Sequence, residues 1–211
     1  MTRPRVLLVD DHRIVAEGLK RLLEADFELA GVVEDGRAMI EAARALRPDV
    51  IVADISMPHL NGLDALARLK QEDPGVKVVF LTMHAEVAYA RRALEAGAAG
   101  FVLKHSAPAE LVLAIRSALE GRTYVAPALA GEVFRAARDG APPDAAASLT
   151  PRQREILALL AEGLAAKEIA GMLGISVRTV EFHKYRMMEI LGLANSAELV
   201  HFAIKHGIVQ I

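Results

Sequence analysis

The stretch VIVADISMP, Val50 to Pro58, decides the fold of the first half of the chain. Four apolar or small residues lead into an acid, Asp54, and Pro58 has no backbone N–H with which to continue a strand. A short apolar run bounded by turn residues is typical of a strand buried on both faces of a parallel sheet. Asp54 would then lie at the carboxyl end of that strand, where open α/β sheets bind ligands. A buried acid there costs free energy unless cations or hydrogen-bond donors surround it.

The length and composition fit one large domain or two ordinary ones. Of the 211 residues, 53% are hydrophobic and 25% are charged, and the net charge is −2. Neither residues 1–120 nor residues 149–211 have a strong excess of one charge, so charge alone does not predict nucleic-acid binding. The lack of cysteine excludes disulfides, thiolate chemistry and cysteine-ligated zinc. The start resembles no signal peptide and no apolar run reaches ~18 residues, so we expect a cytoplasmic protein that does not bind membranes.

Strand-like runs alternate with helical patterns over the first 120 residues. Strands are predicted at 6–9, 29–33, 50–54, 76–82 and 100–104. Helices are predicted at 12–23, 36–46, 63–71, 86–96 and 108–119. This alternation predicts a five-stranded parallel sheet with right-handed crossovers.

Five polar residues lie at or just past the carboxyl ends of these predicted strands, and they should gather on one edge of the sheet: Asp10, Asp11, Asp54, Thr82 and Lys104. Three carboxylates would repel one another, so we expect a divalent cation such as Mg²⁺ between them. A carboxylate beside Mg²⁺ that faces a lysine and a hydroxyl can attack a phosphoryl group and hold the acyl phosphate. Taken alone, the acidic pair at 10–11 is equally compatible with capping the next helix.

Residues 1–120 resemble the receiver domain of bacterial two-component response regulators. The resemblance rests on VDDH at 9–12, DISMPHLNG at 54–62, LTMH at 81–84 and GFVLK at 100–104. It implies a flavodoxin-like, doubly wound sheet with strand order 2-1-3-4-5. It also implies that a sensor histidine kinase phosphorylates Asp54 and that Thr82 and Lys104 contact the phosphoryl group. Magnesium, with Mn²⁺ as a substitute, would be held by Asp11, Asp54 and the backbone carbonyl of Ser56, with Asp10 acting through water.

Three further residues near this edge have two interpretations each. Phe101 stands where these receivers have the aromatic residue that changes rotamer on activation, although many relatives have Tyr there. Without a hydroxyl, Phe101 could switch only through its packing, and the less favoured alternative is an ordinary core residue. His12 and His84 flank the site, and we expect polar loop residues rather than metal ligands at both positions.

Residues 121–148 are predicted to connect two domains. The segment 124–127 should be a short extended entry to a helix whose sparse apolar face contains Ala128, Leu129, Val133 and Phe134. Residues 139–147 are small, polar and proline-bearing, which is typical of a flexible tether.

Four helices are predicted in residues 149–211. Thr150, Pro151 and Gln153 have the spacing of a capping box with proline at the first helical position. The second helix spans 165–173, the third follows Ser176 as N-cap and spans 177–191 with Ile190 inward, and Ser196 should cap the fourth. Two helices joined by a short glycine-containing turn predict a helix-turn-helix. A basic helix face alone, however, is more often a solvated surface.

This half is similar to the all-α, four-helix DNA-binding domain of NarL/FixJ (LuxR-type) regulators. The matches are LTPRQREIL at 149–157, EGLAAKEIAGMLGIS at 162–176, RTVEFHKYRMMEILG at 178–192 and NSAELVHFAIKHG at 195–207. Binding to double-stranded promoter DNA is implied. DNA-backbone contacts would come from Lys167, Thr179, His183, Lys184 and Arg186, and groove-facing side chains from Glu181, Phe182 and Tyr185. Arg178, on the polar face of the third predicted helix, also suits contact with phosphate. Glu181 could accept from cytosine N4 or repel phosphate.

The two resemblances together predict a response regulator in which phosphorylation of Asp54 controls transcription. A homodimer of the phosphorylated protein is expected, with RNA polymerase as a further partner and no enzyme activity beyond self-dephosphorylation. Candidate dimer contacts are Leu199, Val200, Ala203 and Ile204, for which packing within their own domain is equally compatible. Two alternatives stay open: a LuxR-type regulator without phosphate control, and an aspartate-nucleophile phosphatase, although the first strand lacks the Asp-x-Asp pattern of such enzymes.

Overall fold

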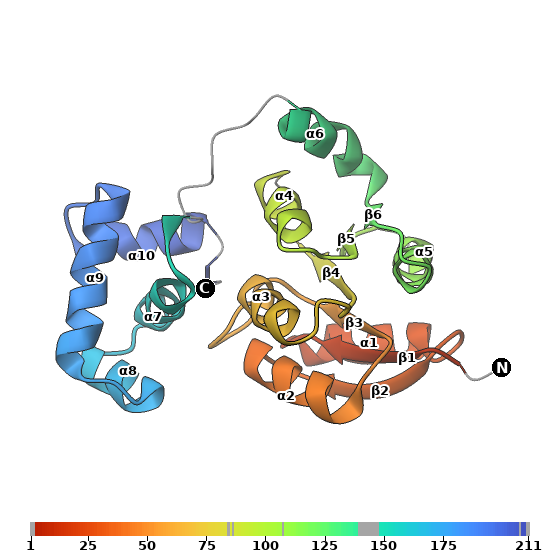
Figure 1. Ribbon diagram of the computed structural model, residues 1–211, viewed down its shortest axis with the longest axis horizontal. Coiled ribbons are helices and arrows are strands. Elements are labelled where there is room, and N and C mark those ends of the chain that lie inside the picture. The colour runs from red at the N-terminus through yellow and green to blue at the C-terminus, as the bar shows by residue number, and fades with distance from the viewer. Residues whose placement is uncertain are drawn as a thin grey trace. The chain divides into compact units, whose positions relative to one another are not determined.

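The computed structural model describes residues 3–83, 85, 87–106, 108–138, 148–206, 208 and 209. These residues form two compact units, of which the first contains a parallel sheet and the second is helical (Figure 1). The tether predicted at 139–147 lies outside the described residues.

The first unit is built around a sheet of six parallel strands in the order β2-β1-β3-β4-β5-β6. The predicted order of the first five strands is confirmed, but the predicted number of five is wrong. The short β6 adds to the edge of β5 by pairing Tyr124 with Gly100 and Val125 with Phe101. The strands are β1 (Arg5–Val9), β2 (Glu28–Val33), β3 (Val50–Ala53), β4 (Val78–Thr82), β5 (Gly100–Leu103) and β6 (Tyr124–Val125).

Five helices alternate with the first five strands, as predicted. They are α1 (Arg13–Leu23), α2 (Gly36–Leu46), α3 (Gly62–Glu72), α4 (Val87–Glu95) and α5 (Pro108–Leu119). Side-chain caps stabilise the N-termini of two of these helices. The carboxylate of Asp35 accepts from the first N–H groups of α2, and Asn61 accepts from the N–H of Asp64 in α3.

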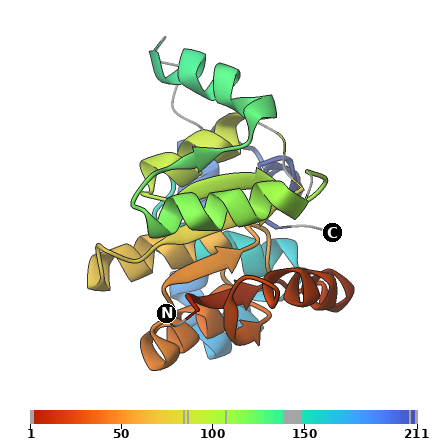
Figure 2. The ribbon, with the colours of Figure 1, turned by 90° about the vertical axis from the view of Figure 1, so that its right-hand side faces the viewer.

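Helices cover both faces of the sheet. Figure 2 shows α1 and α5 in front of one face, where Leu23 and Ile115 pack with Val52 in one apolar cluster. Helices α2 and α3 contact each other on the opposite side (Figure 1). All four residues of β3 are buried, which confirms the prediction of a strand covered on both faces. Complete burial of such a side chain contributes roughly 1.5–3 kcal/mol.

A sixth helix of this unit, α6 (Pro127–Arg138), packs against α4. Leu129 and Val133 are buried, whereas Ala128 is exposed and Phe134 is 70% exposed. The apolar face predicted for this helix is therefore narrower than expected.

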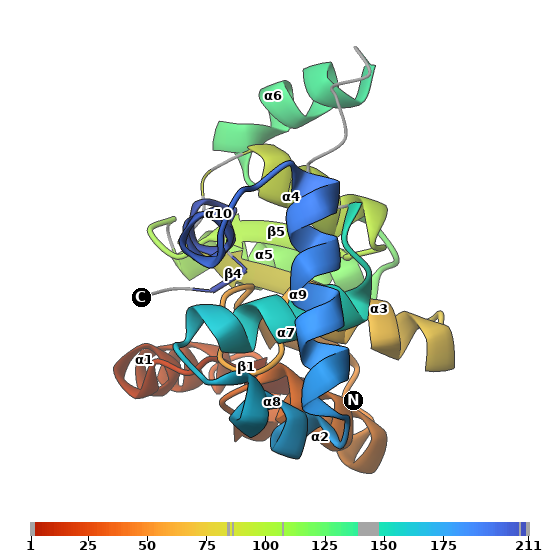
Figure 3. The same cartoon turned by 90° about the vertical axis from the view of Figure 1, so that its left-hand side faces the viewer.

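The second unit consists of α7 (Pro151–Ala161), α8 (Ala166–Leu173), α9 (Val177–Leu191) and α10 (Ser196–Lys205) (Figure 3). Its core contains Ile156, Ile169, Val180 and Met187. The capping box is confirmed, because Thr150 accepts from the N–H of Gln153 and the Gln153 side chain accepts from the N–H of Thr150.

Two local predictions in this unit are wrong. Asn195, not Ser196, caps α10, because its side-chain oxygen accepts from the N–H of Glu198 at 2.9 Å. Ile190 is 39% exposed rather than inward.

In the described part of the chain, no single helix is long and apolar enough to cross a membrane. Helices α9 and α10 meet that criterion only as a pair, with a 69° bend between them.

Candidate functional site

The polar residues predicted to lie at the carboxyl edge of the sheet are brought together there. Strands β1 and β3 are neighbours, and the N–H of Asp54 donates to the carbonyl of Val9, which places Asp54 beside Asp10. Strand β4 lies between β3 and β5, so Thr82 stands between the strand that precedes Asp54 and the strand that precedes Lys104. The backbone N–H of Lys104 donates to the carbonyl of Thr82 at 2.8 Å.

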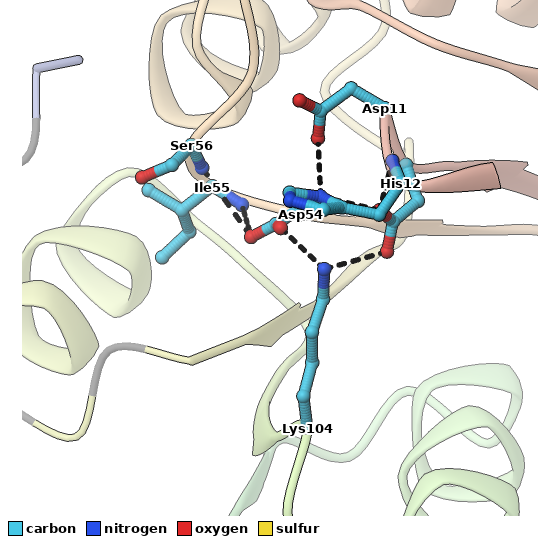
Figure 4. Close-up of polar contacts among 7 residues, drawn as sticks. Asp11, His12, Asp54, Ile55, Ser56 and Lys104 are labelled. Carbon is cyan, nitrogen blue, oxygen red and sulfur yellow. Dashed lines mark hydrogen bonds and ion pairs between the residues drawn. The ribbon is translucent and has the colours of Figure 1, made fainter. Parts of the chain in front are cut away.

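The ammonium group of Lys104 bridges two buried carboxylates (Figure 4). Its Nζ lies 2.6 Å from Oδ2 of Asp54 and 2.7 Å from Oδ2 of Asp10, and both aspartate side chains are at most 3% exposed. Burial raises the pKa of Asp54, although the charge and hydrogen bond of Lys104 oppose that shift. Burial lowers the pKa of Lys104, but the two carboxylates more than offset it and the net direction is upward. The lysine therefore supplies the compensation that these acids require.

The rest of the Asp54 carboxylate is held by the loop that follows β3. Its Oδ1 accepts from the N–H of Ile55 at 2.6 Å and, more weakly, from that of Ser56 at 3.4 Å. Thr82 is completely buried at the end of β4. Phe101 is also completely buried, opposite Phe80 in the neighbouring strand. Thr82 thus adjoins the site, whereas Phe101 lies within the sheet, and the roles of both residues stay predictions.

The acidic side chains form a cluster whose composition fits a divalent cation. One ligand atom from each of Asp10, Asp11, His12 and Asp54 lies within 4.8 Å of the others. Oδ1 of Asp11 is buried and accepts no hydrogen bond from any described residue. Carboxylate oxygens are the ligands that Mg²⁺ prefers. Ser56 is buried close by, although the role of its carbonyl stays a prediction. His12 lies inside this cluster, whereas His84 lies outside the described residues.

Gly62 also belongs to this site. The sequence pattern placed it at the start of a predicted helix and indicated no further role for it. Its N–H donates to the carbonyl of Ile55 at 2.8 Å, which returns the loop to the sheet. A Cβ atom at Gly62 would lie 2.2 Å from the backbone oxygen of Asp54 and 2.9 Å from a ring carbon of Phe80. The backbone of Asp54 would have to move to admit it.

Replacing Gly62 by Ala should therefore lower the free energy of unfolding by roughly 1–3 kcal/mol, as expected for overpacking. A matched control is Gly18→Ala in α1, because a Cβ there meets nothing within 4 Å. That change should raise the free energy by about 0.5–1 kcal/mol through helix propensity. Urea unfolding of both variants compares them, and equal stability would contradict the close approach of Gly62 to Asp54.

The helix-turn-helix is formed by α8 and α9, which pack against each other. On α9, Phe182 and Tyr185 are 64% and 63% exposed. Glu181 and Lys184 form an ion pair at 2.6 Å, and Lys184 Nζ lies 5.4 Å from the centre of the Tyr185 ring. Lys184 thus offsets the negative charge of Glu181, which would otherwise repel DNA phosphates. The other predicted DNA-contacting residues differ in exposure: Lys167, Arg178 and Arg186 are exposed, and Thr179 and His183 are half-buried.

Two of the four candidate dimer residues are not available for contact with a partner. Leu199 is 1% exposed and Ala203 is completely buried, and both belong to the core of their own domain. The apolar spacing along α10 therefore reflects packing within its own domain at these two positions, and not a dimer interface. Val200 is half-buried and Ile204 is 39% exposed, so only these two candidates reach the surface.

Comparisons with known proteins match both halves of the chain. The response regulator receiver domain matches residues 6–116, and the luxR family of bacterial regulatory proteins matches residues 147–203. The transcriptional regulatory protein MctR of Rhizobium johnstonii is 39% identical over 98% of this chain and 95% of its own length. The response regulator UvrY of Escherichia coli K12 is 34% identical over 96% of this chain and 94% of its own.

Solved structures show the same similarity. RcsB from Salmonella enterica serovar Typhimurium, bound to a promoter in the presence of the phosphomimetic BeF₃⁻, is 29% identical and aligns with a TM-score of 0.66. The alignment covers 95% of this chain and 98% of that one. A LuxR-family two-component response regulator from Aurantimonas sp. is 37% identical with a TM-score of 0.62, over 65% of this chain and 99% of that one.

Proposed function

Because this chain belongs to the response regulators that join a receiver domain to a LuxR-type DNA-binding domain, we propose that phosphorylation of Asp54 sets its affinity for promoter DNA. The observation that carries the assignment to Asp54 is its place at the end of β3, where Lys104 Nζ lies 2.6 Å from its carboxylate. A receiver domain implies a kinase as partner, and we infer that this partner is a sensor histidine kinase.

The transfer is a nucleophilic displacement at phosphorus. An oxygen of Asp54 forms the new O–P bond, and the bond between phosphorus and the donor's phosphohistidine nitrogen breaks, with the electron pair leaving on that nitrogen. Asp10, Asp11 and Asp54, with the carbonyl of Ser56, would hold Mg²⁺, or Mn²⁺ in its place, which neutralises charge on the phosphoryl group when bound. Lys104 lies near enough to pair with the phosphoryl oxygens once Asp54 carries them.

The switch would follow from this change of partners. Lys104 exchanges a carboxylate oxygen of Asp54 for phosphoryl oxygens, and Thr82 at the end of β4 supplies a hydroxyl beside them. Such rearrangement shifts the population between two conformations of the domain. Phe101 has no hydroxyl and is completely buried, so it could report the change only by repacking.

Helix α9 is the proposed reader of double-stranded promoter DNA. Glu181, Phe182 and Tyr185 would face the base edges, and the basic and polar residues around them would contact phosphates. We infer that the phosphorylated protein forms a homodimer, with Val200 and Ile204 as the remaining contact candidates on α10, and that RNA polymerase is a further partner. The protein would act in the cytoplasm, without enzyme activity beyond self-dephosphorylation.

Chemical mapping of the phosphoryl group tests the assignment to Asp54. The full chain is incubated with a small acyl phosphate donor and Mg²⁺, the acyl phosphate is trapped by reduction with borohydride, and the modified peptide is identified by mass spectrometry. Modification should appear at Asp54 and be lost in Asp54→Asn. Modification at another aspartate, or unchanged labelling of the variant, would contradict the proposal, and steady hydrolysis of unrelated phosphate esters would favour a phosphatase.

A further inference from the structure

His12 is held over the acidic pocket by its own backbone. It is the N-cap residue of α1, with the extended backbone angles φ −89° and ψ 92°, and its side chain makes no capping hydrogen bond. Its backbone N–H donates instead to Oδ1 of Asp10 at 2.9 Å. This bond fixes the start of the His12 side chain relative to one of the buried carboxylates. The imidazole ring therefore takes no part in capping α1.

The imidazole lies among the carboxylate oxygens. Figure 4 shows the ring beside Asp11 and close to Asp54. Its Nδ1 is 2.9 Å from Oδ1 of Asp11 and 3.3 Å from Oδ1 of Asp10. Yet Oδ1 of Asp11 accepts no hydrogen bond from any residue that the structure describes. A histidine that only paired with this acid would donate to it. Nδ1 of His12 and the oxygens of Asp10 and Asp11 lie as close to one another as donor atoms that share one cation.

A nitrogen ligand changes which cation such a pocket prefers. Carboxylate, carbonyl and water oxygens suit Mg²⁺, whereas imidazole suits the later divalent transition metals, whose affinity for a given site rises from Mn²⁺ towards Cu²⁺. We propose that His12 is an additional ligand of the Asp10–Asp11–Asp54 pocket, which makes this site select Ni²⁺ and similar transition-metal ions over Mg²⁺. The inference rests on the proposed cation site, and it replaces the expectation that His12 is a polar loop residue.

A positioning role is the alternative that the test must separate. If His12 only held the carboxylate of Asp11 in place, its loss would weaken the binding of every cation that Asp11 binds. If it is a ligand, its loss weakens transition-metal binding far more than Mg²⁺ binding. His12→Asn suits this comparison because Asn is a good N-cap residue for α1 and offers oxygen in place of nitrogen.

The experiment is calorimetric titration of the untagged full chain with Ni²⁺ and, separately, with Mg²⁺. His12→Asn should weaken Ni²⁺ binding at this site by roughly tenfold or more and change the Mg²⁺ dissociation constant by less than about twofold. His201→Asn, which removes an exposed histidine of α10, controls for adventitious binding of Ni²⁺ and should change neither value at this site.

Pulsed EPR on the Mn²⁺-loaded protein supplies a readout that positioning alone would not affect. Modulation from ¹⁴N coupled to Mn²⁺ should be present in the wild type and in His201→Asn, and absent in His12→Asn. No nitrogen coupling in the wild type, or equal weakening of Ni²⁺ and Mg²⁺ binding in His12→Asn, would overturn the role of His12. If Asp54→Asn leaves Mg²⁺ binding unchanged, the cation site itself is wrong, and the inference fails with it.

Discussion

Replacing Lys104 by Met should destabilise the receiver domain by about 3 kcal/mol at neutral pH, the cost expected when one partner of a buried ion pair is removed. Lys104 Nζ lies within 2.7 Å of both Asp10 and Asp54. Both acids are at most 3% exposed, so the substitution leaves two buried carboxylates without their cation. Met keeps the length and apolar stem of the side chain, and the change thus isolates the lost charge.

The loss should depend on pH in a definite direction. Burial already raises the pKa of Asp54 and Lys104 opposes that rise, so the pKa of Asp54 increases further in Lys104→Met. Between the ordinary aspartate pKa and this raised value, the folded variant binds a proton that the unfolded chain lacks. Its stability therefore falls as pH rises through that window and recovers as pH falls. The deficit should be greatest above the raised pKa.

Urea unfolding in metal-free buffer at several pH values measures this deficit. The double variant Asp10→Asn, Lys104→Met should regain part of the lost free energy at neutral pH, because it removes one of the two uncompensated carboxylates. If Lys104→Met is as stable as the wild type throughout, the lysine does not supply the compensation that the geometry indicates.

The second large effect is expected in DNA binding. Asp54→Ala should bind DNA with the affinity of the unphosphorylated wild type and gain nothing from a phosphodonor, because no other residue takes its place as acceptor. In this variant Lys104 keeps its ion pair with Asp10 at 2.7 Å, so the domain should remain folded. In the phosphorylated wild type, two linked DNA-binding domains that occupy two half-sites together can raise the affinity for DNA by roughly 10²–10⁴-fold.

The main features of the candidate site were predictable because parallel topology places strand ends at one edge. Asp10, Asp54, Thr82 and Lys104 are far apart in sequence, yet alternating strands and helices required them to meet. The fold of the helical domain was predictable from its capping residues and from the apolar spacing of its helices, as the capping box at Thr150 shows.

Other features depend on contacts that no local pattern encodes. The two residues of β6 are too few for a period to be visible, and they form a strand only because β5 offers an open edge. Leu199 and Ala203 were ambiguous because an apolar stripe on α10 has the same spacing whether it faces its own core or a partner. The constraint on Gly62 comes from Asp54 and Phe80, and that contact exists only after the strands have paired.

The most direct test is the ratio of two dissociation constants for DNA, the first measured without and the second with a phosphodonor and Mg²⁺. Both are measured by fluorescence anisotropy at one fixed salt concentration, on a DNA site selected by the protein. The wild type should bind at least about tenfold more tightly when phosphorylated, and Asp54→Ala should give a ratio of one. A ratio of one for the wild type, with Asp54 shown to be phosphorylated, would contradict control of DNA binding by this site.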